Sequence, residues 1–562
     1  MKLTPTTART AAARRPARDA LRAPAAAAVE PLEGRQMFSV AVNGTSAADV
    51  ITIYQNGVSF DVTVNGVTTR TGNQPVNGFT INCLGGDDQV FVSALVTVPC
   101  EIYGGDGNDN IKSGRGNDYV DGGNGNDTLR GSDGDDTIRG MKGADTIYAG
   151  LGDDNVQGGR GNDYVDGEQG NDFLLGNGMA DDGTTYPDND TIRGGEGNDL
   201  VDGMGGDDVV YGDHGFDEVH GGAGNDRVYG GADNDRLMGG PGDDVLVAIG
   251  GGTGDLIWGE AGRDSFWLDD ARTTELVLDG DAAESAGSAF HFVNQFENNV
   301  TYDNGVLLQE RPTKELYGQP LRDPMAPEAF ANFGKNPLFG ANGPRMEDVR
   351  QGNVGDCYFL AGLSSIARTN PYRIRDAVVD LGDGTYAVRF ANNGVAEYYR
   401  VDADLPVSGG VPSYAKLGAN NSLWVAIMEK AFAYHRYSDG GKYEWLALGR
   451  SEEPFKAIAA PWAEFWGTNG TSLLSQVKQQ LDAGRAVVAS SVNSSPLGGV
   501  AFITQHQYVV TNVDLAAGKI TVRNPWGYDG VTNNDGNQSD GLLTFTAAQF
   551  AQYFKNVTHA KV

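Results

Sequence analysis

The hydrophobic and polar residues between positions 104 and 270 follow a period of nine residues. In each repeat a glycine-rich turn, such as Gly104-Gly-Asp-Gly-Asn-Asp109, precedes one apolar residue, here Ile111, two positions after the aspartate. The register passes through an irregular stretch at 176–187, and Asp264 is a late copy that is out of step. The in-register aspartates are Asp109, Asp118, Asp127, Asp136, Asp145, Asp154, Asp163, Asp172, Asp190, Asp199, Asp208, Asp217, Asp226, Asp235 and Asp244.

This spacing has a chemical rationale. Glycines let the backbone turn so that carbonyl oxygens point inward, each aspartate adds a hard carboxylate ligand, and the apolar residue fills a thin core between short strands. The repeat resembles the Gly-Gly-x-Gly-x-Asp-x-U-x nonapeptide of RTX proteins, which implies a parallel β-roll that binds Ca²⁺ at these aspartates. Without calcium the carboxylates repel one another, and the region is expected to be largely unfolded. A disordered acidic tract is the alternative, which the many in-register copies disfavour.

The pattern divides the rest of the chain. Residues 1–38 form a basic Ala/Arg-rich leader, and residues 39–100 alternate like β-strands with turns at Asn56-Gly57 and Asn65-Gly66. The β-roll is expected over 101–272 and a spacer over 273–325. Residues 326–562 read as a mixed α/β domain, with helices at 423–433 and 472–483 and strands at 486–490, 507–513 and 519–523.

The stretch Gln351-Gly-Asn-Val-Gly-Asp-Cys357 precedes a helical spacing of apolar residues that ends at Asn370-Pro371. A cysteine at a helix N-terminus sits where unpaired N–H groups and the helix dipole favour the thiolate, the reactive form. Taken alone, Cys357 is more often a plain core cysteine. Its partners elsewhere in the chain change that interpretation.

One histidine is well placed to act with Cys357. His506 begins one predicted strand, and the next strand leads into Asn524. Pairing the two strands across the turn at 515–518 sets His506 opposite Asn524, where the amide can orient the imidazole. The order Cys, His, Asn is that of papain-like proteases.

At these residues the domain 326–562 resembles calpain-type cysteine peptidases of the papain-like α/β fold. The Gln-Gly-x-x-Gly-Asp-Cys pattern, the His506-Gln-Tyr508 pattern, the intact Arg523-Asn-Pro-Trp-Gly527 and the helix Met428-Glu-Lys-Ala-Phe-Ala433 carry the resemblance. It implies Cys357 as nucleophile, His506 as general base and acid, and Asn524 as the group that orients the histidine. It also implies Gln351 as an oxyanion donor and Trp526 as a shield. Tyr358 replaces the usual tryptophan after the cysteine, and Gln505 replaces the usual glycine before the histidine.

The resemblance also implies calcium in the protease core. Its first site maps onto Ala341, Gly343, Asp348 and Glu429. Asp529, Asp535 and Asp540 lie in a loop suited to a second site, although their spacing aligns poorly.

Composition narrows the class. The formal charge of −33 over 562 residues argues against nucleic-acid binding and suits a calcium-rich milieu. No apolar run approaches the roughly 18 residues that span a bilayer. Cys83 and Cys100 either form a disulfide, leaving Cys357 as the free thiol of a secreted protein, or are two separate buried thiols. Residues 29–38 resemble the Leu-Glu-Pro-Arg type of N-terminal motif of surface or exported proteins in planctomycete-like bacteria, with Gly34 in place of its proline.

Together these features predict a secreted or surface-attached bacterial endopeptidase that depends on calcium and cleaves protein substrates through a Cys-His-Asn triad and a thioester. The roll would serve calcium-dependent folding, export or attachment. Two alternatives remain open: a calcium-stabilised surface or adhesion protein with an inactive peptidase domain, and a self-processing domain.

Overall fold

The computed structural model describes residues 38–72, 76–177, 187–250, 254–269, 276–277, 289–298, 301–303, 306–309, 321, 323–340, 342–436, 442–447, 449–458, 460–465, 470–492, 503–527 and 541–562. Residues 1–37, Ala341, most of the 310–322 stretch and the loop that holds Asp529, Asp535 and Asp540 lie outside this description.

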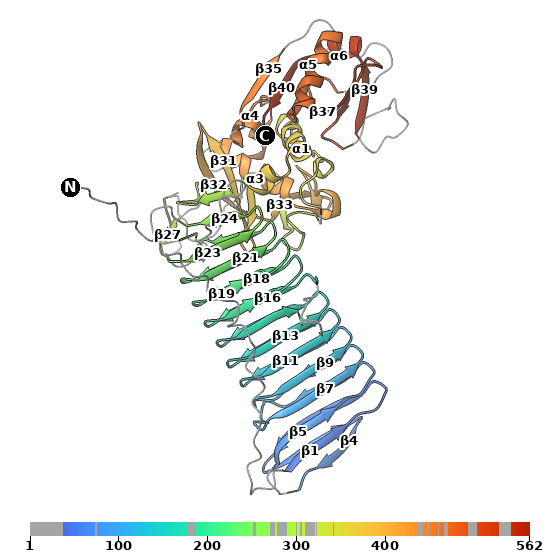
Figure 1. The fold of residues 1–562 in the computed structure, drawn as a ribbon, viewed down its shortest axis with the longest axis vertical. Helices are drawn as coiled ribbons and strands as arrows, with labels where there is room; N and C mark the ends of the chain where they lie inside the picture. The colour runs from blue at the N-terminus through green and yellow to red at the C-terminus, as the bar shows by residue number, and fades with distance from the viewer. Residues whose placement is uncertain are drawn as a thin grey trace, which may run out of the picture.

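The N-terminal half of the described chain is a long stack of short parallel strands, which confirms the predicted β-roll (Figure 1). Successive strands alternate between two sheets, so partners within a sheet are two nonapeptides apart, as in Leu129 opposite Ile147. One sheet runs β1 (Phe38–Asn43), β5 (Val76–Asn82), β7 (Cys100–Asp106), β9 (Tyr119–Asn124), β11 (Thr137–Lys142), β13 (Asn155–Arg160), β15 (Phe173–Asn177), β17 (Leu200–Asp202), β19 (Glu218–His220), β21 (Arg236–Pro241), β23 (Leu256–Ala261) and β25 (Leu276–Val277).

The second sheet faces the first across the thin core. It runs β26 (Ala289–Phe292), β24 (Ser265–Leu268), β22 (Val245–Ala248), β20 (Arg227–Ala232), β18 (Val209–His214), β16 (Thr191–Glu196), β14 (Tyr164–Gln169), β12 (Thr146–Leu151), β10 (Thr128–Asp133), β8 (Asn110–Lys112), β6 (Gln89–Val92), β2 (Val50–Asn56), β3 (Ser59–Val64) and β4 (Val67–Arg70). A separate hairpin joins β27 (Thr301–Asp303) and β28 (Val306–Gln309).

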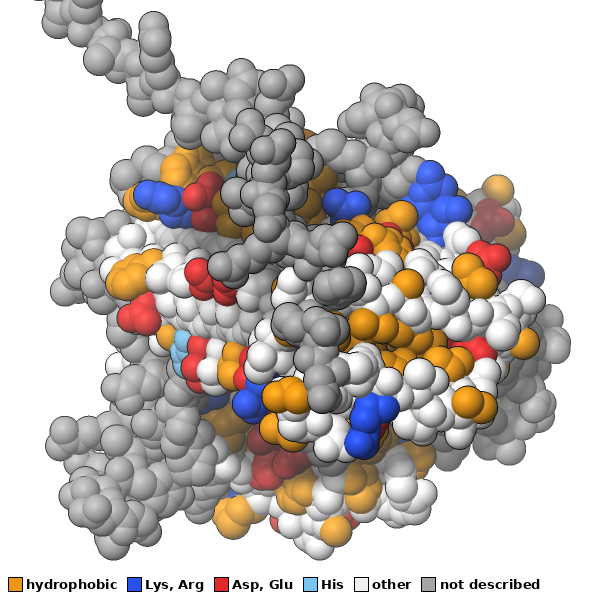
Figure 2. All heavy atoms as spheres, turned by 90° about the horizontal axis from the view of Figure 1, so that it is seen from below, with side chains coloured by type: hydrophobic (Ala, Val, Ile, Leu, Met, Phe, Trp, Pro, Cys, Tyr) orange, Lys and Arg blue, Asp and Glu red, His pale blue; other side chains and the backbone are white. Residues whose placement is uncertain are grey.

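The strands of residues 38–92 continue the two sheets of the roll rather than forming a body of their own. β2, β3 and β4 close the second sheet at this end as an antiparallel meander. Figure 2 looks onto this end of the molecule, where hydrophobic side chains gather on the surface. Val58 and Val67 are 73% and 70% exposed there.

The core of the roll is a file of repeat residues that are fully buried. The apolar residue two positions after each in-register aspartate is 0% exposed, at Ile111, Val120, Leu129, Ile138, Ile147, Val156, Val165, Leu174, Ile192, Val201, Val210, Val219, Val228, Leu237 and Leu246. Cys83 and Cys100 are buried in this core as free thiols, so of the two alternatives that the sequence left open the structure has the separate thiols and not the disulfide. Cys100 begins β7 and lies opposite Phe79 of β5, whereas Cys83 follows the last residue of β5, four positions farther along the chain.

The C-terminal domain combines helices with three antiparallel sheets. The helices are α1 (Cys357–Thr369), α2 (Tyr372–Arg375), α3 (Trp424–Arg436), α4 (Glu453–Ala457), α5 (Gly470–Asp482) and α6 (Ala547–Tyr553), with 3₁₀ turns η2 (Met346–Asp348), η3 (Ala419–Asn421) and η4 (Tyr443–Leu446). The sheets run β29 (Ala329–Asn332), β33 (Asp404–Ser408), β34 (Val411–Pro412); β30 (Val378–Asp380), β31 (Thr385–Asn392), β32 (Val395–Asp402); and β35 (Trp462–Phe465), β40 (Phe554–Ala560), β36 (Ala486–Ser491), β37 (Gln507–Asp514), β38 (Lys519–Arg523), β39 (Leu542–Thr546).

Two cores organise this domain. One surrounds α1 and α3, and the other lies between the six-stranded sheet and helices α5 and α6. Helix α1 joins them, because Ser365 Oγ accepts a hydrogen bond from Val487 N at 2.7 Å on β36. The predicted helix after Cys357 is confirmed, and α3 extends three residues beyond its predicted end at Ala433.

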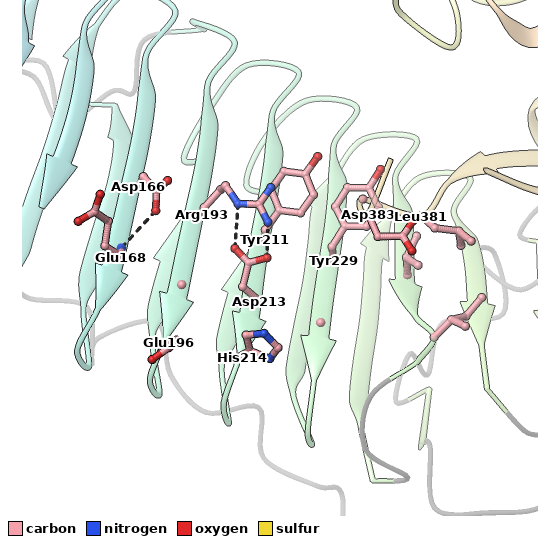
Figure 3. A pocket seen from close by; sticks show the side chains of 15 residues that line it. Asp166, Glu168, Arg193, Glu196, Tyr211, Asp213, His214, Tyr229, Leu381 and Asp383 are labelled. Carbon is pink, nitrogen blue, oxygen red and sulfur yellow. Dashed lines mark hydrogen bonds and ion pairs between the residues drawn. The ribbon is translucent and has the colours of Figure 1, made fainter. Parts of the chain in front are cut away.

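The last turns of the roll pack against the C-terminal domain. Trp267 and Tyr229 of the roll share an apolar cluster with Leu381 and Tyr398 of the domain. Arg263 pairs with Asp376 at 2.9 Å. Beside this contact, strands β14, β16, β18, β20 and β22 of the second sheet and the turn at 381–383 line a cavity of about 340 Å³, in which Arg193 pairs with Asp213 and stacks on Tyr211 (Figure 3).

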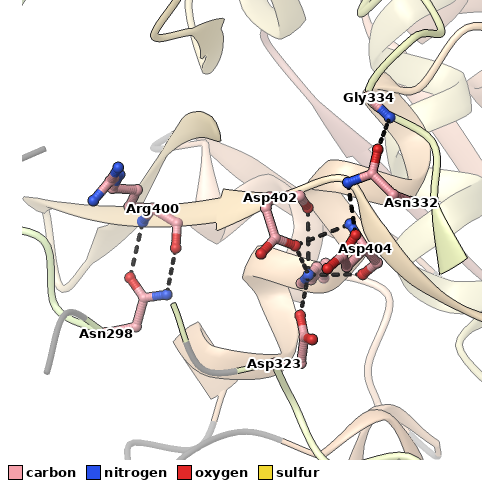
Figure 4. A network of polar contacts seen from close by, with 8 residues as sticks. Asn298, Asp323, Asn332, Gly334, Arg400, Asp402 and Asp404 are labelled. Carbon is pink, nitrogen blue, oxygen red and sulfur yellow. Dashed lines mark hydrogen bonds and ion pairs between the residues drawn. The ribbon is translucent and has the colours of Figure 1, made fainter. Parts of the chain in front are cut away.

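Polar contacts tie Asn298 and Asp323, which precede the C-terminal domain in the chain, to that domain (Figure 4). Asn298 exchanges two hydrogen bonds with the backbone of Arg400, at 2.6 and 2.8 Å. The ammonium of Lys430, next to Glu429 on α3, is 2% exposed and pairs with Asp323 and Asp402. A buried ammonium is tolerated when carboxylates and carbonyls surround it, and Asp404 O supplies a further acceptor at 2.8 Å.

Candidate active site and calcium ladders

The imidazole of His506 is fixed by the residues predicted to hold it. β37 and β38 pair antiparallel, which brings His506 Nε2 to 2.9 Å from Asn524 Oδ1. The Trp526 ring meets the imidazole edge-on at 5.4 Å, and Trp526 N donates to the same Asn524 oxygen at 3.0 Å. Because Nε2 is the nitrogen bound to Asn524, Nδ1 is the nitrogen available to take a proton.

Two further residues that the sequence did not single out also position His506. Ser491 Oγ on β36 accepts a hydrogen bond from His506 N at 3.0 Å. The Tyr508 ring meets the imidazole edge-on at 5.0 Å, and its hydroxyl is bound to the backbone of Ile503. The quoted His506-Gln-Tyr508 pattern contained the second of these, whereas the serine lies in a strand with no distinguishing motif.

Cys357 is the first residue of α1, where the first-turn N–H groups lack intrahelical partners. Burial raises the pKa of its thiol to about 11, against the N–H groups of Gln507, Tyr358 and Cys357, which lower that pKa. Burial likewise lowers the pKa of His506 to about 4, against the hydrogen bond that its Nε2–H donates to Asn524 Oδ1, which raises that pKa. Burial therefore disfavours a lone charge on either group, and a charge on one is stabilised when the opposite charge forms on the other.

Gln351 begins the turn that leads into Cys357, and its side-chain amide already donates hydrogen bonds. Its Nε2 donates to Val354 O at 2.7 Å and to Asp356 Oδ1 at 3.2 Å. Its backbone N–H donates to Pro525 O at 2.9 Å, which ties the turn before Cys357 to the loop that follows Asn524. Gln351 is thus placed next to Cys357, and its amide would have to exchange a partner to reach a substrate oxygen.

Behind this turn lies a pair of buried carboxyl groups that the sequence reasoning did not foresee. Asp356 is 0% exposed and Glu429 is 1% exposed, and their side chains hydrogen-bond to each other. Burial and the charge of Asp356 raise the pKa of Glu429 well above its usual range, so Glu429 is the protonated partner. The two residues are far apart in the chain, and no local pattern links them.

The residues predicted for the protease-core calcium site have separate partners. Asp348 Oδ2 accepts from Trp424 Nε1 at 2.9 Å and from Arg345 N at 2.8 Å, while Glu429 Oε2 accepts from Ala415 N at 2.8 Å. Gly343 has the left-handed φ of 67° that suits a turn. Across the described residues, no three His, Cys, Asp or Glu side chains gather around one point that could hold a metal ion.

The repeat aspartates of the roll form two hydrogen-bonded ladders. The N–H of each aspartate donates to the carboxylate of the next one on the same side, as in Asp127 N to Asp145 Oδ1 at 2.7 Å. One ladder runs Asp49, Asp88, Asp109, Asp127, Asp145, Asp163, Asp190, Asp208, Asp226, Asp244 and Asp264. The other runs Asp118, Asp136, Asp154, Asp172, Asp199, Asp217, Asp235 and Asp255.

Most ladder carboxylates keep one buried oxygen that accepts no hydrogen bond from the described part of the chain. These are Asp88, Asp109, Asp127, Asp136, Asp145, Asp154, Asp163, Asp172, Asp190, Asp199, Asp208, Asp217, Asp226 and Asp244. Burial raises the pKa of Asp136, Asp208 and Asp244 to about 9, against backbone N–H groups that lower it. A hard cation such as Ca²⁺ fits an anionic oxygen that is buried among turn carbonyls.

The glycine turns bring the backbone close to these oxygens. A Cβ at Gly122 would lie 2.4 Å from Asp127 Oδ2, and Gly123 has a φ of +105° that L side chains rarely adopt. Each ladder begins at a carboxylate that the protein itself satisfies. Thr45 and Asn65 donate to Asp49, whereas Ser113, Gly114 and Cys100 donate to Asp118.

Asp88, Asp255 and the capping residue Asp49 were absent from the predicted calcium set. Their spacings from the next aspartate are irregular, 39 residues from Asp49 to Asp88 and 21 from Asp88 to Asp109. Leu84 has the same left-handed φ, 75°, as the second position of the regular repeats. The sequence Leu84-Gly-Gly-Asp-Asp88 is therefore a weak signal of one further repeat of the roll.

Comparisons with known protein families give a separate match for the C-terminal domain and for the roll. Residues 326–551 match the family model of the calpain family cysteine protease. Segments from 101–129 to 211–246 match the model of the RTX calcium-binding nonapeptide repeat. The chain thus combines a parallel β-solenoid of calcium-binding RTX repeats with a calpain-type protease domain.

Among curated relatives, human calpain-8 is 27% identical over 210 residues, 34% of this chain and 29% of the relative. The calpain-2 catalytic subunit of Rattus norvegicus is 24% identical over 287 residues, 45% of this chain and 40% of the relative. The chain therefore spans less than half the length of these relatives. None of the helices described here is long and apolar enough to cross a membrane.

Proposed function

We propose that this chain, with its calpain-type protease domain and RTX roll, is a calcium-dependent cysteine endopeptidase. The observation that carries the proposal is the pairing of His506 with Asn524, 2.9 Å apart, beside a cysteine that starts a helix. Each of these three residues has an ordinary structural use on its own. Their convergence with Trp526 and Gln351 around one turn is what hydrolysis through a thioester requires.

In the proposed reaction, the Cys357 thiol gives its proton to His506 Nδ1 while Sγ attacks the peptide carbonyl carbon. Asn524 holds Nε2–H and stabilises the imidazolium that forms. The carbonyl oxygen becomes an oxyanion, which the Cys357 N–H and the Gln351 amide stabilise once that amide leaves Val354 or Asp356. Collapse breaks the C–N bond, and His506 returns the proton to the leaving amine.

Deacylation follows the same path in reverse. Water gives a proton to His506 as it attacks the thioester carbon, and the C–S bond breaks with the electron pair on Sγ. The thiolate regains its proton from the imidazolium, and the acid product leaves. The Trp526 ring, edge-on to the imidazole, would help to keep water away from the hydrogen bond between the buried side chains of His506 and Asn524.

Calcium enters the proposal through the roll. Ladder carboxylates with a buried, unshared oxygen would hold the ions, and bound calcium would neutralise charges whose repulsion otherwise opposes folding. The RTX repeats and the net charge of −33 both suit a protein that works outside the cell, where calcium is abundant. Surface attachment through the roll or the leader belongs to the same proposal.

The test is hydrolysis of fluorescently labelled casein by the full chain with calcium or with a chelator, beside a Cys357→Ala control. We expect cleavage in calcium, little or none in chelator, and none from Cys357→Ala in either condition. Cleavage that persists in Cys357→Ala would overturn the mechanism. Equal cleavage by the wild-type chain in calcium and in chelator would overturn the calcium dependence.

A further inference from the structure

Residues 449–454, here the bridging segment, contact both the helix that bears Cys357 and the strands next to His506. On one side Gly449 lies against the Tyr358 ring, so closely that a Cβ there would be 2.1 Å from Tyr358 Cζ. Pro454 lies against Gly362, where a Cβ would be 2.2 Å from the proline ring. Tyr358 and Gly362 are one helical turn apart, so the segment follows one face of α1 from its first residues.

The Tyr358 side of this contact is held by Arg436 at the end of α3. Arg436 Nη1 donates to Tyr358 Oη at 2.6 Å and to Leu446 O at 3.0 Å. Arg436 Nε lies 3.6 Å from Glu453 Oε2 of the bridging segment. The Tyr358 side chain is buried, so this guanidinium fixes the residue that follows the nucleophile against the bridging segment.

The other side of the bridging segment is held by Ser451. Gln507 Nε2, in the residue after His506, donates to Ser451 Oγ at 2.5 Å. Ser451 Oγ also lies 3.1 Å from Ser490 Oγ on β36, and Ser491 is the neighbour that binds His506 N. Ser451 is 5% exposed, so water does not readily replace these hydrogen bonds.

The thiol lies on the first residue of α1 and the imidazole on the residue just before β37, so their separation depends on what joins those elements near Cys357. Ser365 joins α1 to β36 more than two turns beyond the nucleophile. At the nucleophile end, the bridging segment connects Tyr358 to Gln507. We infer that Arg436, Tyr358 and Ser451 are positioning residues, and that the bridging segment sets the distance between the thiol and the imidazole.

The inference deepens the proposed function and rests on it. It also gives a physical role to a departure of this chain from the calpain pattern. A tryptophan after the cysteine has no hydroxyl to accept from Arg436, whereas Tyr358 accepts at 2.6 Å. Small displacements of reacting groups are costly, because catalysis needs near-attack geometry.

The test compares Tyr358→Phe, Ser451→Ala and the double variant of the full chain in calcium, using a quenched fluorescent peptide that the wild type cleaves. We expect each single variant to lower kcat by roughly tenfold with KM within about twofold. The double variant should be little worse than either single one, because both changes break the same connection. Ser451→Thr keeps a hydroxyl and should retain most of the activity.

A second readout needs no turnover. The rate at which iodoacetamide alkylates Cys357, followed by mass spectrometry from pH 5 to 9, should fall near neutral pH in both single variants. Ser475→Ala removes an exposed serine hydroxyl on α5 and should leave both readouts unchanged. Wild-type kcat and alkylation in Ser451→Ala, or multiplicative losses in the double variant, would overturn the bridge.

The two proposals fail separately. A wild type that cleaves no peptide would contradict the proposed function, and the alkylation profiles would still decide the bridge. If Ser451→Ala does not fold, Ser451→Thr and Tyr358→Phe carry the comparison, and wild-type alkylation in Tyr358→Phe would then overturn the inference.

Discussion

The imidazole of His506 is held from several directions by short-range contacts. Asn524 binds Nε2, Ser491 binds the backbone N–H, and the rings of Tyr508 and Trp526 flank the ring plane. Such support fixes the tautomer and the direction of Nδ1, and the proposed proton transfer from Cys357 would need both.

Replacing Asn524 tests that support. Asn524→Ala removes the acceptor of Nε2–H, so the imidazole can rotate and the neutral ring can adopt the wrong tautomer. We expect kcat to fall by roughly 10²-fold with the fold preserved, and stability to drop by about 1 kcal/mol for the lost hydrogen bond. Steady-state kinetics and a thermal melt measure the two effects. A variant with wild-type kcat would show that Asn524 is only structural.

The pairing of His506 with Asn524 and the helix that begins at Cys357 could be predicted because the signals were local. Gln351 to Cys357 and Arg523 to Gly527 are short motifs, and the pairing of adjacent strands followed from the turn at 515–518. The buried pair of Asp356 and Glu429 could not be predicted, since it depends on how α3 packs behind α1. The hydrogen bond of the Gln351 amide to Val354 could not be predicted either, because it depends on the side-chain rotamer within the folded turn.

At the scale of elements, the ladders show how a period of nine residues becomes structure. Two nonapeptides make one coil, so an aspartate of a regular repeat meets the one 18 residues on. The nine extra residues at 178–186 lengthen one step in each ladder to 27 without breaking the hydrogen bonds. The period predicted the strands and the buried file. It did not reveal that Ser113 satisfies Asp118, because one glycine-to-serine change does not alter the register.

Comparing a capped with an open rung tests the role of the unshared oxygens. Asp127→Asn removes the charge from a carboxylate whose second oxygen has no partner among the described residues, whereas Asp118→Asn alters one already bound by the Gly114 N–H and the Ser113 hydroxyl. We expect Asp127→Asn to raise the calcium concentration needed for folding and to lower the melting temperature in calcium by about 2–4 °C more than Asp118→Asn. Equal effects would contradict the distinction.

The pH dependence of the calcium-free roll follows from the ladder pKa values. Burial raises most of them above 3.8, to values between about 6 for Asp145 and about 9 for Asp136, so folding without calcium takes up protons. Its stability is therefore greatest below about pH 4 and is lost as the pH rises through about 6 to 9. In chelator, far-UV circular dichroism should show more strand at pH 5 than at pH 8. Saturating calcium should remove or reverse this order, because the metal needs ionised ligands. Greater order at pH 8 in chelator would contradict the prediction.

At the scale of the whole molecule, the roll provides the platform on which the protease domain rests. The contact is built from Trp267, Tyr229 and Val247 on its last turns and from Leu381 and Tyr398 on the domain. Neither half of the sequence carried a signal for this contact, because it depends on complementary outer faces rather than on the repeat or the catalytic motifs. Calcium that orders the roll would thereby also order this platform.

Trp267→Ala tests that coupling. Trp267 is 0% exposed and stacks on His291 at 4.2 Å, so its loss should cost about 3–5 kcal/mol at the junction. In calcium, we expect limited proteolysis to release the C-terminal domain faster from this variant, while the roll keeps its strand content. Leu95→Ala, an exposed apolar residue far along the chain from the junction, is the matched control. Equal release from both variants would mean that the junction does not stabilise the domain.

The proposed thioester can be detected by mass spectrometry of the full chain and its peptides after acid quenching during turnover of a peptide ester in calcium. The proposed mechanism predicts one acyl group on the peptide that contains Cys357 in the wild type. It predicts little or none at the same time in His506→Ala, in which no base takes the thiol proton. Hydrolysis by the wild type without any acyl group on Cys357, or with one on another residue, would contradict it.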